Sequence, residues 1–192
     1  DHLITDGAEN TLAVMLDESG KPEEAEPLHR RVLERRRAIF GAKHDATLIS
    51  MSNLASALKN LGRLDEALSI YEESSPLAKE VLGVRNMTTL AVLYNFGTTL
   101  HAVGKHAEAL SQLQEVFTVG SEILGENHPK MLSTQMFIGD CHDELGNIDE
   151  AIRIYQHVVP ASREVMGATH PEVILRGNNL AYYLGKAGRH AE

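Results

Sequence analysis

The sequence contains very little cysteine. Cys141 is the only cysteine in 192 residues, so the chain can form neither an intrachain disulfide nor a metal site built from several thiolates. Nothing in the surrounding sequence would activate this thiol, which favours a buried helix position over a nucleophile. A reducing compartment fits this cysteine usage, and we expect a cytoplasmic protein.

Long apolar runs and an excess of positive charge are also missing. No apolar run approaches the ~20 residues that a membrane-spanning helix needs. The formal net charge of -9 argues against general binding to nucleic acid or to anionic membranes. With 43% hydrophobic and 23% charged residues, the composition is that of a folded protein rather than a disordered tail.

The common catalytic motifs are absent as well. We find no phosphate-binding loop, no His-Glu-x-x-His, no Gly-x-Ser-x-Gly and no pair of ligands at a credible metal spacing. Neighbouring titratable residues such as His142, Asp143 and Glu144 are common on helices and define no site by themselves. We therefore expect neither an enzyme nor a cofactor.

What the sequence does contain is a repeat. Glycines recur every 42 residues in two sets, at 41, 83, 125 and 167 and at 20, 62, 104, 146 and 188. Alanine follows the second set by five places, at 25, 67, 109 and 151, and glutamate precedes each of these alanines. The chain is therefore a tandem array of one supersecondary unit.

The stretch LGENHPKML (residues 124–132) resembles a catalytic or metal-binding cluster, but the repeat assigns it another role. His128 recurs as His2, His44 and His170, with Asn86 in the remaining repeat. A catalytic residue is normally needed once, whereas a boundary signal recurs at every boundary. His or Asn before Pro or Asp fits the residue that caps a helix start. The preceding glycines (41, 83, 125 and 167) fit a helix that ends in a left-handed residue.

Each repeat reads as two helices around a tight turn. In residues 43–84, apolar and small residues follow helical spacing before and after Gly62, so a first helix, a turn and a longer second helix are predicted. Small residues recur at fixed positions, where two backbones can approach closely. They are Ala13, Ala55, Gly97, Gly139 and Ala181 in the first helices and Ala25, Ala67, Ala109 and Ala151 in the second.

Three prolines fall inside predicted second helices, at 27, 76 and 160. Each should either bend its helix or split it, and the sequence leaves both alternatives open. We expect a single array over residues 1–192. Its repeats are 1–42, 43–84, 85–126 and 127–168, with a partial repeat at 169–192, as in a fragment of a longer protein.

Such helix-turn-helix repeats resemble the tetratricopeptide repeats, and the 42-residue period resembles the kinesin light chain type. The closest stretch is EAEPLHRRVLERRRAIFGAKHDATLISMSNLASAL, residues 24–58. The resemblance implies an all-α fold, an α-solenoid of stacked antiparallel hairpins wound into a right-handed superhelix. Its concave face would be lined mainly by the first helices and would form an extended groove.

The resemblance also implies which positions contact a bound peptide. They include, in each first helix, the two residues that precede the large apolar residue next to the small position, such as Ser52 and Asn53 before Leu54-Ala55. They also include a basic residue near the end of a second helix. Asn amides can grip a peptide backbone, and Tyr94 offers an apolar ring with a polar tip; alternatively the asparagines tie adjacent helices together. The residues are Arg36, Ser52, Asn53, Tyr94, Asn95, Asn178 and Asn179, with Met136, Phe137, Asn10 and Thr11 in the same register.

Two charged stretches have alternative interpretations. The run from His29 to Arg37 holds five arginines, which fits a patch for acidic partners or a solvated face balanced by nearby glutamates such as Glu26, four residues before Arg30. An acidic stretch formed by Asp140, Asp143 and Glu144 fits either a site for basic partners or an ordinary surface.

The leading functional hypothesis is therefore an interaction scaffold that binds a peptide segment of a partner protein in its concave groove. We expect no nucleic-acid partner, no membrane insertion and no metal. Two alternatives stay open. One is a regulatory or sensor module attached to an effector or ATPase domain outside these residues. The other is a structural module that self-associates.

Overall fold

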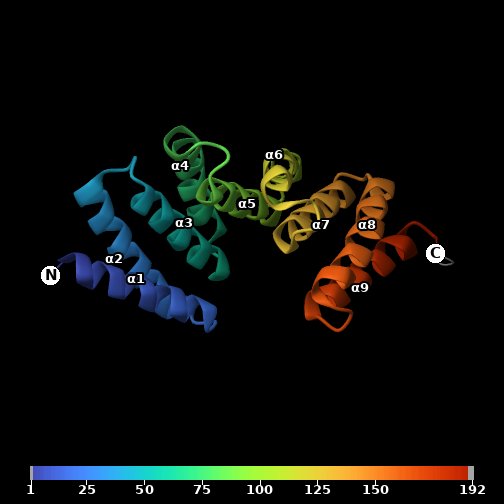
Figure 1. The fold of residues 1–192 in the computed structure, drawn as a ribbon, viewed down its shortest axis with the longest axis horizontal. Helices are drawn as coiled ribbons and strands as arrows, with labels where there is room; N and C mark the ends of the chain where they lie inside the picture. The colour runs from blue at the N-terminus through green and yellow to red at the C-terminus, as the bar shows by residue number, and fades with distance from the viewer. Residues whose placement is uncertain (1, 190–192) are drawn as a thin grey trace. The chain divides into compact units, whose positions relative to one another are not determined.

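The computed structural model describes residues 2–189, with side chains from residue 7 onward, and these residues form nine α-helices and no strand (Figure 1). The odd-numbered helices are the predicted first helices and the even-numbered ones the predicted second helices. They are α1 (His2–Glu18), α2 (Pro22–Phe40), α3 (Asp45–Asn60), α4 (Leu64–Leu82), α5 (Met87–Ala102), α6 (His106–Leu124), α7 (Pro129–Glu144), α8 (Ile148–Met166) and α9 (Pro171–Lys186).

The helices pack into two compact units. The N-terminal unit is Asp1–Val103 and holds α1 to α5, and the C-terminal unit is Gly104–Glu192 and holds α6 to α9. Within each unit every helix packs on the next one in the chain. The boundary falls at the glycine turn inside the predicted repeat 85–126, so the division into repeats and the single array over 1–192 stay predictions.

The tight turns between paired helices confirm the glycine set at 20, 62, 146 and 188. At Gly62 the φ angle is +74°, which L side chains rarely adopt. Its N–H donates to the Lys59 carbonyl at 3.0 Å, and the Arg63 N–H donates to the Leu58 carbonyl at 2.9 Å. These two bonds form a Schellman motif, which satisfies carbonyls at the helix end. The same pair of bonds closes the turns at Gly20, Gly146 and Gly188.

The glycine set at 41, 83, 125 and 167 differs in detail from the prediction. Gly41 has φ 83° and ψ 172°, and its three counterparts have positive φ with ψ from 148° to 158°. Positive φ was expected, but the left-handed helical ψ was wrong. The backbone is extended there, in a region that essentially only glycine reaches, because the chain must leave one helix and turn toward the next.

The histidines at the position of His128 in LGENHPKML cap helices. His128 Nδ1 accepts the Lys130 N–H at 3.2 Å, at the start of α7. His44 and His170 make the same bond, and Asn86 makes it with its side-chain oxygen. This confirms the structural interpretation of the repeated motif; the side chain of His2 lies outside the described residues.

The core lies between helices and depends on the small positions. Ala25, Ala67, Ala109 and Ala151 are all fully buried. At Gly139 a Cβ atom would lie 3.0 Å from the ring of Tyr155, so a larger residue there would force a neighbour to move. In the N-terminal unit, Tyr71 and Met51 pack with Leu54 and Leu58 in one cluster.

The prolines do not split their helices. Pro27, Pro76 and Pro160 lie inside α2, α4 and α8, each of which runs without interruption for 19 residues. The alternative of a split second helix is therefore wrong, while a shared bend stays a prediction.

The alanine column gives a first prediction. Ala67→Leu should lower the free energy of unfolding by about 1–3 kcal/mol, because its site is fully buried against neighbouring helices. Urea unfolding measures the loss. Ala107→Leu on the exposed side of α6 is the control and should change little; equal midpoints for the two variants would contradict this packing.

The cap column gives a second prediction. His128→Ala should cost about 1 kcal/mol of stability, whereas His128→Asn should retain most of it, because Asn86 supplies the same acceptor in this chain. Thermal unfolding measures the midpoints of both variants, and we expect the midpoint of His128→Asn to be the higher one. Identical midpoints for Ala and Asn would show that capping is not the role of this residue.

Candidate functional site

The predicted peptide contacts of the N-terminal unit lie together on α3 and α5. These two first helices contact each other although α4 separates them in the chain. Ser52 and Asn53 lie on α3, and Tyr94 and Asn95 lie on α5; all four side chains are half-buried. We call this set, with Lys59 and Thr98 described below, the α3–α5 face.

Two amides on this face are available to a ligand. Within the described part of the chain, the side chains of Asn53 and Asn95 make no hydrogen bond to another residue, and neither does the Ser52 hydroxyl. The interactions in this segment use the backbone instead: the Ser52 carbonyl accepts from Tyr71 at 3.4 Å, and the Asn95 carbonyl accepts from Thr98 at 3.0 Å. The alternative that these asparagines tie helices together therefore has no support at these two positions.

A lysine completes the α3–α5 face. Lys59 follows Ser52 by seven residues, which places both on one side of α3. Its ammonium donates to the Thr98 hydroxyl on α5 at 3.1 Å. Desolvation lowers the pKa of Lys59, because burial disfavours the charged form. Among residues 7–189, no carboxylate lies within ion-pair distance of this ammonium.

The side chain of Arg36 forms a contact between α2 and α3. Its guanidinium donates to the Ala46 carbonyl at 3.2 Å and to the Ser50 hydroxyl at 2.9 Å, so it joins α2 to α3. The C-terminal unit shows the same pair in reverse: Arg176 on α9 donates to the Ser162 hydroxyl on α8 at 2.6 Å. Both pairs lie at corresponding positions of the repeat. The arginine can therefore come from either helix and still join it to the next, which indicates a role in packing.

In the C-terminal unit a cluster of tyrosines engages one of the predicted positions, Asn179. Asp140 on α7 accepts hydrogen bonds from the hydroxyls of Tyr155 at 2.7 Å and Tyr183 at 2.6 Å. The Asn179 amide donates to the Tyr155 oxygen at 3.0 Å. Burial raises the pKa of both phenols, and the Asp140 carboxylate raises it further. Asn179 thus joins α9 to α8, as the alternative interpretation of the asparagines holds.

The acidic residues of α7 likewise have partners within the unit. Asp143 pairs with Lys186 on α9 at 2.6 Å, and Glu144 lies 3.9 Å from a nitrogen of His106. Asn178 is exposed, while Met136 and Phe137 are half-buried on α7. Burial raises the pKa of the Cys141 thiol to about 12, which leaves it protonated and unreactive at neutral pH.

The arginine run of α2 is balanced by acids from three helices. Arg30 pairs with Glu26 at 2.5 Å, as its spacing predicted. Glu9 on α1 binds Arg31 and Arg35, and its hydrogen bond to Arg35 is the main reason that its pKa is lowered. Arg37 pairs with Glu73 on α4 at 2.8 Å. The interpretation as a balanced helix face therefore fits the observed contacts better than a patch for acidic partners.

No metal or membrane feature was found in the described residues. Among them, no three His, Cys, Asp or Glu side chains are grouped closely enough to hold a metal ion. No described helix is both long and apolar enough to cross a membrane.

A family comparison identifies the repeat. The tetratricopeptide repeat (TPR) model matches residues 5–80 and 88–164. The chain belongs to the tetratricopeptide repeat family. No curated protein matches it.

Solved structures agree with this TPR assignment. The nearly identical TPR-like repeats of a candidate kinesin light chain from Podosopora anserina, in a variant form, superpose with a TM-score of 0.85 at 22% identity, covering 100% of this chain and 90% of that one. BtubC (BKLC) from P. vanneervenii gives 0.83 at 20% identity, with 98% and 76% covered. A Rap protein in complex with the competence and sporulation factor gives 0.76 at 10% identity, with 95% and 49% covered. These likenesses show the fold, an all-α stack of helix pairs of the kinesin light chain type.

Sequence reasoning missed Lys59 and the tyrosine cluster of this TPR chain. A signal for Lys59 existed, because it lies two helical turns after Ser52 on the predicted ligand-binding side of a first helix. No comparable signal existed for Tyr155 and Tyr183, since their shared partner Asp140 lies on a third helix.

The tyrosine cluster gives a third prediction. Asp140→Ala should lower the free energy of unfolding by about 1–3 kcal/mol, because it leaves the hydroxyls of two buried tyrosines without their acceptor. Urea unfolding followed by tyrosine fluorescence is the measurement. Asp149→Ala is the control, since this carboxylate is 88% exposed. A loss no larger than that of the control would contradict the role assigned to Asp140.

Proposed function

We propose that this TPR chain is a protein-binding scaffold that holds an extended segment of a partner protein on the α3–α5 face. Lys59 would bind an acidic group of that segment, and Asn53 and Asn95 would bind its backbone. TPR folds typically mediate protein–protein contacts, and the Rap protein shares this fold and was solved with a bound factor.

The observation that carries the proposal is the environment of Lys59. A half-buried ammonium has lost part of its hydration, and the Thr98 hydroxyl replaces only one of its three hydrogen-bonding partners. Arg30, Arg37 and Lys186 each have a carboxylate beside them. A carboxylate supplied by a ligand would give Lys59 the acidic partner that these cations already have. It would favour the charged form of Lys59, which burial disfavours.

The neighbouring side chains suit an extended chain. An Asn amide both donates and accepts, so Asn53 and Asn95 can bind the N–H and C=O groups of a peptide without selecting its sequence. Tyr94, which occupies on α5 the repeat position of Ser52, would add apolar contact at low entropic cost. Arg36 and Asn179, which the family resemblance also suggested, are left out because helix contacts already engage them.

The proposal includes no catalytic step and no cofactor. Its acidic ligand preference comes from one residue of the α3–α5 face rather than from the arginine run of α2, whose charges are paired within the protein. A cytoplasmic location, a concave groove and the two alternative functions stay predictions.

Peptide selection tests the proposal. A library of randomised dodecapeptides is selected on the whole chain, and the enriched peptides are titrated by fluorescence anisotropy. We expect enrichment of Asp and Glu. We also expect Lys59→Ala to weaken binding about tenfold or more, because a hydrogen bond to a charged group contributes about 1.5–3 kcal/mol.

Matched variants test whether binding depends on the positive charge of residue 59 and on its position in the protein. Lys59→Arg should keep most of the affinity, and Lys130→Ala, on the exposed surface of the other unit, should leave it unchanged. Asn53→Ala combined with Asn95→Ala should weaken all selected peptides regardless of their sequence. Equal affinities for the wild type, Lys59→Ala and the double Asn variant would remove the α3–α5 face from the account.

A further inference from the structure

A row of ion pairs joins the second helices α2 and α4 of the N-terminal unit. Arg37 pairs with Glu73 at 2.8 Å, and Lys43, just after α2, pairs with Glu80 at 2.5 Å. At the other end Glu26 pairs with Arg63 at 3.2 Å, and Arg30 lies 3.9 Å from Glu66. The partners are 36 or 37 residues apart in every case. We call these four pairs the charge ladder.

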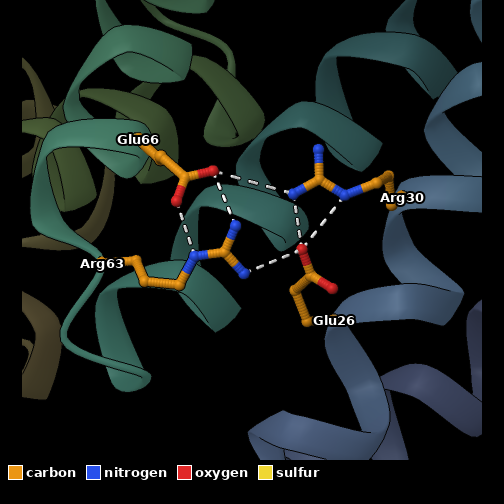
Figure 2. A network of polar contacts seen from close by, with 4 residues as sticks. All are labelled: Glu26, Arg30, Arg63 and Glu66. Atoms are coloured by element: carbon orange, nitrogen blue, oxygen red, sulfur yellow. Dashed lines mark hydrogen bonds and ion pairs between the residues drawn. The ribbon is translucent and has the colours of Figure 1, made fainter.

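One end of the charge ladder is a closed ring (Figure 2). Arg63 binds Glu66 through two hydrogen bonds of 2.6 and 2.7 Å, and Glu26 binds Arg30 within α2. Each of the four side chains thus contacts one partner on its own helix segment and one across the gap. The Glu26 carboxylate is the most buried of them, with 14% of its side chain exposed.

The charge order fixes the register of the two helices. Along α2 an acid, Glu26, precedes three bases, whereas on the α4 side a base, Arg63, precedes three acids. If α4 slid along α2 by one helical turn toward its own C-terminal end, Arg63 would come close to Arg30. Because like charges in contact are unfavourable, the reversed order of acid and base in the Glu26–Arg63 pair disfavours a shift of α4 along α2 in this direction.

The C-terminal unit has no counterpart at the corresponding positions. Two repeats after Arg30, Arg37 and Lys43, the sequence has three uncharged side chains, Gln114, Ser121 and Asn127. The positions that correspond to Glu66, Glu73 and Glu80 are Glu150, His157 and Glu164. The second helices α6 and α8 therefore cannot form such a ladder at these positions.

Both helices of the charge ladder pack on α3, which carries Ser52, Asn53 and Lys59. We infer that the charge ladder is a salt-sensitive strut that fixes the spacing and register of α2 and α4, and thereby limits the motion of α3 between them. This property goes beyond the proposed binding function and does not depend on any ligand. All four pairs of the charge ladder lie within the N-terminal unit.

The physical basis is screening. Single exposed ion pairs contribute little, but several pairs in one network reinforce each other. Salt shortens the Debye length from about 10 Å at 0.1 M to about 3 Å at 1 M. Raising the salt concentration should therefore loosen the contact between α2 and α4 while leaving the apolar contacts of both units intact.

Hydrogen exchange of the whole chain without ligand, read by mass spectrometry, tests the inference. Between 20 mM and 500 mM NaCl, amides of α2, α3 and α4 should exchange roughly threefold or more faster, while amides of α6 and α8 should change less than twofold. Glu73→Gln combined with Glu80→Gln should show the fast exchange already at 20 mM NaCl and respond little to salt. The control is Glu164→Gln, which removes one negative charge at the position of α8 that corresponds to Glu80 and should leave exchange unchanged.

A charge swap distinguishes the effect of the ion pair from the effect of changing either side chain. Arg37→Glu and Glu73→Arg should each accelerate exchange in α2 and α4, and the two together should restore slow exchange at 20 mM NaCl. Equal salt responses of the two units, or a swapped variant no slower than either single variant, would overturn the inference.

Discussion

The structure depends on the burial of apolar side chains between neighbouring helices, because no helix can cover its own apolar face. Each helix carries an apolar stripe that only a neighbouring helix can cover, so first helices such as α3 and α7 pack on the second helices before and after them. Close packing requires the small positions, and the fully buried Ala67 and Ala151 mark where two backbones approach. The glycine turns allow the chain to reverse at the spacing that this packing sets, because they adopt positive φ angles.

Both units pack their helices in this way, and polar side chains distinguish them. In the C-terminal unit Asp140, Asp143 and Asn179 are bound by tyrosines or by lysine, so its first helices are tied to their neighbours. In the N-terminal unit ion pairs join α2 to α1 and to α4, while Asn53 and Asn95 make no side-chain hydrogen bond to another described residue and Lys59 bonds only to the Thr98 hydroxyl. The α3–α5 face carries these amides and Lys59 together, and this face is the basis of the proposed function.

The sequence predicted what is local and periodic. The helices, the cap at His128 and the buried alanine positions follow from a 42-residue period, because a repeated signal identifies a repeated boundary. It left open what depends on contacts between repeats. Whether Arg36 faces a ligand or Ser50, and whether Asn179 is free or bonded to Tyr155, is decided by residues 14 and 24 positions away on neighbouring helices. The charge ladder was hidden for the same reason, since the register of α2 against α4 is a property of the packed unit.

Photo-crosslinking tests the central claim most directly. A photoreactive phenylalanine analogue replaces Ser56, which lies between Ser52 and Lys59 on α3, or Ser69, which is exposed on α4. With a selected acidic peptide present, the account predicts crosslinks from position 56 that excess unlabelled peptide abolishes, and none from position 69. Crosslinks from position 69 alone would place the ligand on the second helices and contradict the account.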